Sequence, residues 1–350
     1  MDIKPLQIGN LTAKIPVIQG GMGVGISLSS LAGAVAKEGG IGIISTAQIG
    51  YREDTFDSDP IGSNLRAIQK EVEKARQIAP EGIIGVNIMV ATRQYEEYVK
   101  AAVDAGVDLI ISGAGLPMTL PAIVGDADTK LAPIVSSAKS ADVIIKYWLK
   151  KYNRLPDMVV IEGPKAGGHL GFSLEQLQAM EAMNYEEEIK KIIALVNQYA
   201  QVHDKKIPVV VAGGVYERKD MEKYLALGAN GVQMATRFVT TYECDASDAY
   251  KQAYINAKKE DIIIVKSPVG MPGRAIRNTF MEKAKEGNIP HGKCHLCIST
   301  CKPAETPYCI TEALVNAVKG DVENALLFCG TNAYRAEKLE HVADIMQEFV

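Results

Sequence analysis

The segment IEGPKAGGHLGF, residues 161–172, has the composition of a loop that could do chemistry at the end of a buried strand. Four apolar residues, Met158–Ile161, lead into it, and Gly167 and Gly168 directly precede His169. Glycines let a chain approach a ligand closely, and an imidazole exchanges protons near neutral pH. The residues alone leave two interpretations of His169, an acid–base group or a structural histidine bonded to a backbone carbonyl.

A second group of reactive side chains is the set of cysteines in KCHLCISTCKPAETPYC, residues 293–309. Their spacing is C-x2-C-x3-C-x7-C, and four thiols so close in sequence can surround one metal centre, as thiolates do with zinc or an iron–sulfur cluster. The alternatives are a [4Fe–4S] cluster, a structural zinc ion with His291 or His295 replacing one thiolate, and metal-free thiols. The predicted metal ligands are Cys294, Cys297, Cys301 and Cys309.

Two further segments have the composition of anion-binding loops. VVVAGGV, residues 209–215, places Gly213 and Gly214 at a strand end, where backbone N–H groups can face an anion. GANGVQMATRF, residues 228–238, follows with Ala235 and Thr236. The pair predicts a phosphate-bearing cofactor or substrate, and two ordinary tight turns are the alternative.

Polar side chains at two other strand ends suit the edge of a flat ring. VIQGGMG, residues 17–23, presents Gln19 and Met22, and VNIMV, residues 86–90, presents Asn87. Side-chain amides beside small apolar groups can hydrogen-bond the rim of a heteroaromatic cofactor. An asparagine in a strand can equally pair with neighbouring backbone, so this signal is weaker than the others.

The elements that must position these residues are short apolar, β-branched runs separated by amphipathic helical stretches. Runs that are apolar throughout predict strands buried on both faces, as in a parallel sheet. Eight alternating units favour a closed α/β (β/α)8 TIM barrel over an open doubly wound sheet. The two anion-type segments then follow strands seven and eight, where such barrels often bind phosphate. The predicted strands are 15–21, 40–46, 82–90, 108–115, 131–137, 158–163, 207–214 and 231–238.

The pattern changes after Phe238, where helix-like stretches surround the cysteine segment. We therefore predict a barrel domain over residues 1–244. Residues 245–350 are predicted to form a smaller, mostly helical C-terminal appendage that carries the four-cysteine motif and packs on the barrel.

The composition narrows the class of protein. The chain has 350 residues, 47% of them apolar and 23% charged, with a net charge of −4. Such values suit a soluble globular protein, and the absence of a basic stripe argues against nucleic acid as a partner. The sequence shows no apolar run of spanning length and no signal-peptide layout at its start, so we expect no membrane association and a cytoplasmic location.

Five motifs together resemble the nitronate monooxygenase (formerly 2-nitropropane dioxygenase) family, which includes the enoyl-acyl-carrier-protein reductase II enzymes. They are QGGM, VN, EGPKAGGH, AGGV and GANGVQMATRF, in the family's order and spacing. The resemblance continues through GMPGRAIRN and GDVENALLFCGTNAYR and so covers nearly the whole chain. It implies a (β/α)8 barrel that binds FMN.

The resemblance also implies roles for individual residues. His169 matches the family's catalytic histidine, which acts on a proton near the substrate carbon in nitronate oxidation and polarises the carbonyl in the reductases. The residues implied to bind FMN are Gln19, Gly20, Gly21, Met22, Asn87, Gly167, Gly168, Gly213, Gly214, Gln233, Ala235 and Thr236.

Two positions depart from the family pattern. Lys165 stands where the family usually has a glutamate, which exchanges a carboxylate for an ammonium and could favour an anionic substrate or a phosphate-bearing electron donor. Ala235 replaces a glycine but keeps its backbone N–H. Arg274 and Arg277, in GMPGRAIRN, are candidates to meet a phosphate or a substrate carboxylate, or are simply surface charges.

Three functions are compatible with these residues. The first is oxidation of alkyl nitronates with dioxygen by an FMN-dependent oxidoreductase. The second is reduction of an activated C=C bond, such as that of an enoyl thioester, with electrons from NAD(P)H or through the cysteine cluster, whose spacing is similar to that of 2,4-dienoyl-CoA reductase. The third, from another class, is a non-flavin phosphate-binding barrel such as an aldolase or isomerase. The expected partners are a small-molecule substrate, an electron-donor protein if the cluster is present, and a second copy in a homodimer.

Overall fold

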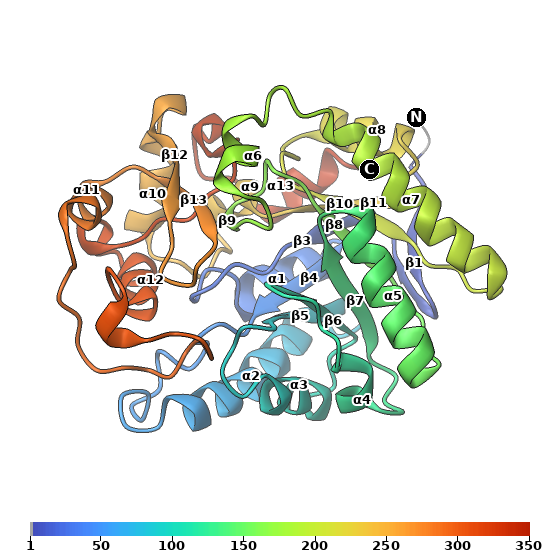
Figure 1. The fold of residues 1–350 in the computed structure, drawn as a ribbon, viewed down its shortest axis with the longest axis horizontal. Coiled ribbons are helices and arrows are strands. Elements are labelled where there is room, and N and C mark those ends of the chain that lie inside the picture. Colours follow the sequence, from blue (N-terminus) through green and yellow to red (C-terminus); the bar gives the residue numbers. More distant parts are fainter. Residues whose placement is uncertain (1–2) are drawn as a thin grey trace.

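The computed structural model describes residues 3–350 and contains a closed barrel of parallel strands (Figure 1). All eight predicted strands are confirmed, and the closing pair joins β11 to β3, with Met234 opposite Gln19. The strands are β3 (Val17–Gln19), β4 (Ile41–Ser45), β5 (Ile83–Met89), β6 (Leu109–Gly113), β7 (Lys130–Val135), β8 (Val159–Glu162), β10 (Val209–Ala212) and β11 (Gly231–Met234).

The apolar runs form strands because both of their faces are buried. In β4 every residue is buried, with Ile41 and Ile43 in the barrel interior and Ile44 in the layer between barrel and helices. Successive side chains of a strand point to opposite faces, so a continuous apolar run fills both layers. A short hairpin of β1 (Leu6–Ile8) and β2 (Leu11–Ala13) adds Leu6 and Ile8 to the interior core.

Helices surround the barrel and connect successive strands (Figure 1). The last helix, α13 (Val342–Gln347), packs beside α1 and shares a core with β3 and β11 through Ile345 and Met346. The C-terminal end of the chain therefore covers the barrel where the ring of strands closes. The connecting helices are α1 (Ser29–Lys37), α2 (Pro60–Ile78), α3 (Tyr95–Asp104), α4 (Leu120–Val124), α5 (Ala138–Tyr152), α6 (Leu174–Gln178), α7 (Tyr185–Val202) and α8 (Arg218–Ala226), and α9 (Thr236–Val239) follows the last strand.

The C-terminal region is less helical than predicted. It holds α10 (Asp248–Asn256), α11 (Thr279–Glu286) and α12 (Ile310–Lys319), which lie with the hairpin of β12 (Ile262–Lys266) and β13 (Pro272–Ile276) at one side of the barrel (Figure 1). β13 also pairs with β9 (Gly168–His169), from the barrel's own loop. The domain boundary at residue 244 stays a prediction.

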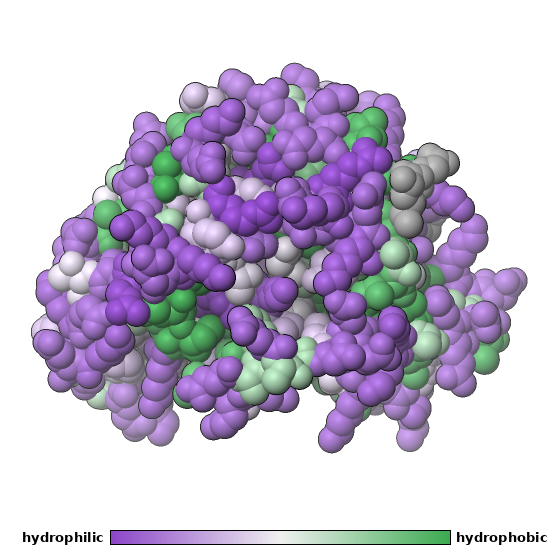
Figure 2. Space-filling view, turned by 90° about the horizontal axis from the view of Figure 1, so that it is seen from above, coloured by the Kyte–Doolittle hydropathy of each residue, from purple (hydrophilic) through white to green (hydrophobic). Residues whose placement is uncertain are grey.

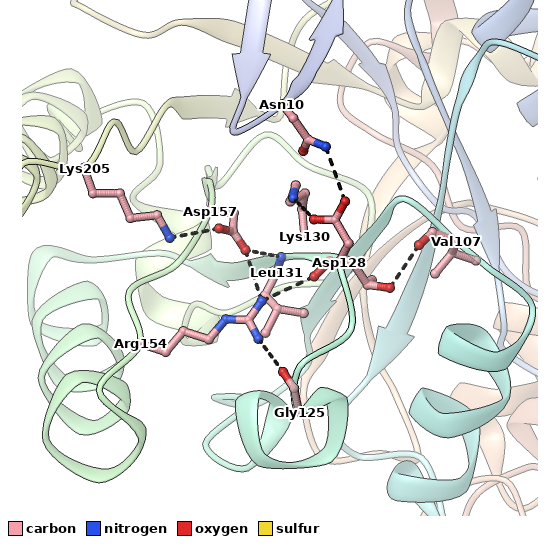
Figure 3. Close-up of polar contacts among 10 residues, drawn as sticks. Asn10, Val107, Gly125, Asp128, Lys130, Leu131, Arg154, Asp157 and Lys205 are labelled. Atoms are coloured by element: carbon pink, nitrogen blue, oxygen red, sulfur yellow. Dashed lines mark hydrogen bonds and ion pairs between the residues drawn. The ribbon is translucent and has the colours of Figure 1, made fainter.

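The amino ends of the strands are held by acidic and amide side chains. Asp157 accepts from the backbone N–H of Leu131 at 2.9 Å and from Lys205 Nζ at 2.8 Å (Figure 3). Asp108 accepts from the backbone N–H of Ile84 in β5, and Asn230 accepts from that of Val209 in β10. These contacts lie at the end of the barrel opposite the site and fix the register of neighbouring strands.

The face shown in Figure 2 is covered mainly by hydrophilic residues, with hydrophobic residues in small separate groups. Among residues 3–350, no helix is both long enough and apolar enough to cross a bilayer.

Candidate active site

A cavity of about 430 Å³ opens at the carboxyl ends of the barrel strands. This is the end at which (β/α)8 enzymes carry their active sites. The structure brings eleven of the twelve predicted cofactor residues to its wall together with His169. They are Gly20, Gly21, Met22, Asn87, Gly167, Gly168, Gly213, Gly214, Gln233, Ala235 and Thr236.

Gln19 is the exception. Its side chain is fully buried, and its amide accepts from the backbone N–H of Ile43 at 3.1 Å and donates to the Ile43 carbonyl at 3.2 Å. The side chain therefore joins β3 to β4 and does not line the cavity, because neighbouring backbone satisfies both ends of its amide.

On one wall of the cavity the backbone of Gly20 and Gly21 packs closely against neighbouring side chains, as it would beside a flat ring. A Cβ at Gly21 would lie 2.5 Å from the Asn87 Cβ, which is too close for any residue but glycine, and one at Gly20 would be tight, at 3.2 Å from Gln233 Cγ. Gln233 Oε1 is buried without a hydrogen-bond partner among the described residues. A buried acceptor left unpaired is available to a donor from a bound molecule.

His169 is positioned by the C-terminal hairpin. Its backbone pairs with Gly273 of β13, its Nε2 lies 2.7 Å from Ser267 Oγ, and its ring meets Phe328 edge to face at 4.9 Å. Burial lowers the pKa of His169 to about 4, so the imidazole is neutral at pH 7. A neutral imidazole whose Nε2 is held by a hydroxyl keeps Nδ1 for a substrate proton or oxygen.

Ser267 therefore acts as a positioning residue for His169. We expect Ser267→Ala to lower kcat about 10- to 100-fold, because a freed imidazole spends less time in the reactive orientation. Cofactor content should stay unchanged, since Ser267 is outside the cavity wall. Steady-state kinetics with Ser267→Thr as the matched control would check this: the threonine variant keeps the hydroxyl and should recover most of the rate. Equal losses in both variants would contradict a hydrogen-bonding role.

Glu162 is a cavity residue to which we gave no role from the sequence. It ends β8 and lines the cavity, and burial raises its pKa to about 7. In the sequence Glu162 is a carboxylate that directly follows an apolar strand. The residue type alone does not show whether such a carboxylate is exposed to water at the rim or buried away from it.

The raised pKa of Glu162 makes stability depend on pH. Burial favours the protonated form of Glu162 in the folded state. Its contribution to the free energy of unfolding is therefore complete below the pKa that Glu162 has in the unfolded chain, and is lost as the pH rises through about 7. We expect the wild type to lose more stability than Glu162→Gln between pH 5 and pH 8. Urea midpoints of both proteins at those two pH values measure it. Parallel pH dependences would show that Glu162 is not desolvated.

The anion-type loops lie side by side and are joined by a third segment that sequence reasoning missed. Gly213 and Gly214 adopt φ values of +101° and +81°. Asn332 Nδ2 donates to the Gly214 carbonyl at 2.8 Å, and the Gly330 N–H donates to Thr236 Oγ1 at 3.0 Å. The backbone N–H groups of Gly214, Ala235 and Thr236 have no partner among residues 3–350, as expected of an anion site.

The predicted metal site is not supported. Among residues 3–350, no group of three or more His, Cys, Asp or Glu side chains is placed to hold a metal ion. Cys294 is exposed whereas Cys297 lines the cavity, and burial raises the pKa of the Cys297, Cys301 and Cys309 thiols.

The cysteine segment instead forms part of the cavity wall. The Arg93 N–H donates to the Cys297 carbonyl at 3.0 Å, and the Ser299 N–H donates to the Ala91 carbonyl at 3.0 Å. These backbone contacts extend the segment along the loop after β5. The four thiols nevertheless lie close enough for the charge of one to raise the pKa of another.

The two arginines predicted as ligand contacts are not on the cavity wall. Arg274 is buried, its guanidinium donates to the Ala166 carbonyl, and burial lowers its pKa to about 10. It therefore supports the loop that carries His169. Arg277 is exposed, and its backbone N–H donates to the Asp261 carbonyl.

The closed barrel and a cavity with paired anion loops at its carboxyl end define a (β/α)8 enzyme that binds a phosphate-bearing cofactor. A family model described as nitronate monooxygenase matches residues 4–350, and the chain belongs to that family. Members of this family are FMN-dependent flavoenzymes, so the chain is an oxidoreductase.

Individual relatives agree with this assignment. A probable nitronate monooxygenase of Staphylococcus saprophyticus is 27% identical over 315 residues, covering 82% of each chain. Another, of Staphylococcus haemolyticus, is 26% identical and covers 97% of this chain and 94% of its own. FabK from Thermotoga maritima has a TM-score of 0.71 at 25% identity, covering 96% and 92%. A nitroalkane oxidase from Streptomyces ansochromogenes shares the fold, with a TM-score of 0.72 at 19% identity over 96% and 94%.

Proposed function

We propose that this protein oxidises alkyl nitronates with dioxygen, using FMN held at the carboxyl end of the barrel. The observation that carries the proposal is the neutral, positioned His169 on the wall of a glycine-lined cavity, in a chain that matches the nitronate monooxygenase family from residue 4 to residue 350.

The cavity has the groups that FMN would need. Gly20 and Gly21 leave room for the ring, and Gln233 Oε1 offers an unpaired acceptor. The loops at Gly213-Gly214 and Ala235-Thr236 would hold the phosphate. FMN, when bound there, supplies the electron-transfer chemistry that the protein's side chains lack.

His169 would handle the substrate's proton and orientation. Its Nδ1 makes no hydrogen bond within the described residues and could take the carbon-bound proton of a neutral nitroalkane, which would leave the imidazolium and generate the nitronate in place. Ser267 keeps the ring from rotating away, and Phe328 excludes water from one side of it. The apolar surroundings favour the neutral imidazole, which is the form able to act as a base.

Reduction of a C=C bond is the second candidate, and a particular observation favours it. Ile298, Ile310 and Leu314 from the C-terminal region give the cavity an apolar wall that would suit an acyl chain. FabK from Thermotoga maritima, a structural neighbour at 25% identity, is an enoyl reductase. NAD(P)H would then have to enter the same cavity.

One experiment separates the two candidates. The holoenzyme is given an alkyl nitronate under air while oxygen uptake and nitrite are followed, and in parallel it is given an enoyl thioester with NADH or NADPH without oxygen. Oxygen uptake with nitrite release supports the main proposal. Nucleotide oxidation that depends on the thioester, without nitronate turnover, would replace it with the reductase.

Expectations about partners and location stay predictions. A small molecule is the substrate that this cavity would accept. The homodimer, the electron-donor protein and the cytoplasmic location rest on the sequence alone.

A further inference from the structure

The cavity wall carries little fixed charge. Of the residues that line it, only Glu162 and Lys165 have side chains that are formally charged at neutral pH, and Lys165 is the single cation. A phosphate monoester brings about two negative charges at neutral pH. Any phosphate held in this cavity therefore has one candidate for a cationic side-chain partner.

Lys165 lies beside the anion loops. A Cβ built on Gly214 would be 3.0 Å from the Lys165 Cδ and 3.1 Å from its Cβ, so the aliphatic stem runs along the loop that follows β10. The Lys165 carbonyl accepts from the Thr331 N–H and from Thr331 Oγ1, both at 3.2 Å. The same 330–332 segment contacts Thr236 and Gly214, so its hydrogen bonds fix the lysine backbone relative to both loops.

The ammonium is available for a ligand. Lys165 is exposed and forms no ion pair with any residue of the range 3–350. A nearby carboxylate is Glu186, whose pKa is lowered mainly by its hydrogen bond to Lys223 and further by the charge of Lys165. Because Lys223 Nζ already lies 2.6 Å from Glu186 Oε1, that carboxylate is neutralised without Lys165.

We propose that the Lys165 ammonium binds the phosphate of FMN, together with the backbone N–H groups of the loops at Gly214 and Ala235-Thr236. This assignment rests on the proposed function, because it takes FMN as the occupant of the cavity. The charge-assisted bond adds to the backbone contacts and distinguishes FMN from riboflavin, which has the same ring but no phosphate.

The test compares FMN with riboflavin on the full-length protein after flavin exchange. Dissociation constants are measured by quenching of flavin fluorescence for the wild type, Lys165→Met and Lys165→Arg. Lys191→Met, which removes an exposed lysine of α7 that pairs with Glu188, is the control. Lys165→Met is expected to weaken FMN binding about tenfold and to leave riboflavin binding within about twofold. Lys165→Arg and Lys191→Met should resemble the wild type.

Salt dependence gives a second readout. FMN binding by the wild type should weaken as ionic strength rises, and Lys165→Met should reduce this dependence because one screened charge pair has been removed. Riboflavin binding should show little dependence in either protein.

Each other outcome overturns the assignment in a recognisable way. Unchanged FMN binding in Lys165→Met would mean that backbone groups alone hold the phosphate. Equal weakening of FMN and riboflavin would indicate a structural role. A rise in the KM for NADPH in Lys165→Met, without a change in FMN affinity, would show that Lys165 binds a phosphate of the nucleotide and not that of FMN. Failure of the wild type to bind either flavin would reject the proposed function and this inference with it.

Discussion

Replacing His169 with alanine is expected to lower kcat about 10²- to 10⁴-fold, the usual contribution of a positioned acid–base group. The imidazole lies on the cavity wall, its Nε2 is held by Ser267 and its ring by Phe328, so no other described group can take its place at that point. FMN content should change little, because the predicted cofactor contacts are otherwise retained.

The prediction also specifies how the rate should depend on pH. With a pKa of about 4, His169 stays neutral through the ordinary pH range, and the wild-type rate should fall only as the pH drops through that value. The alanine variant should lack this acidic limb. Steady-state rates and bound flavin measured from about pH 3 to pH 8 would check both points. A variant that retains full activity would show that His169 is structural.

Replacing Gly167 with alanine is expected to have the second large effect, on stability and on the site together. A Cβ there would lie 2.5 Å from the carbonyl carbon of Cys329 and 2.6 Å from the backbone nitrogen of Gly330. Main chain cannot move aside as a flexible side chain would, so we expect a loss of about 3 kcal/mol in the free energy of unfolding. The displaced 330–332 segment should also weaken the anion loops that it joins.

Gly168 provides the matched control. It has a φ of +70°, but a Cβ there meets nothing within 4 Å. Gly168→Ala should therefore cost only about 1–2 kcal/mol of backbone strain. Urea unfolding and FMN retention of the two variants measure the difference. Similar losses in both would show that the two main chains do not approach as closely as the structure indicates.

The barrel could be predicted from the sequence because its signals are local. Each strand is a short run that is apolar throughout, and each is separated from the next by a helical stretch, so eight repeats were countable before any contact was known. The glycines and His169 at the strand ends also follow from this, because parallel strands bring their carboxyl ends to one rim.

The parts that could not be predicted depend on contacts between distant segments. β9 has only two residues and exists because β13 pairs with it about one hundred positions later in the chain. Gly330 and Asn332 reach the anion loops by the same kind of long-range contact. Nothing in the local residue pattern specifies which loop such a segment will meet.

Residue type misled the prediction at Gln19, which has the amide expected at a cofactor edge but is satisfied by the Ile43 backbone. The four-cysteine metal site stays a prediction. No described group of three or more ligating side chains is placed to hold an ion, although the thiols lie close enough to affect one another's pKa.

The central claim is that the cavity at the carboxyl end of the barrel binds FMN. The most direct measurement is the visible absorption spectrum of protein purified from flavin-replete cells, with the released chromophore identified by chromatography. We predict flavin bands and release of FMN in about one equivalent per chain. A colourless protein that takes up no FMN on incubation would contradict the account.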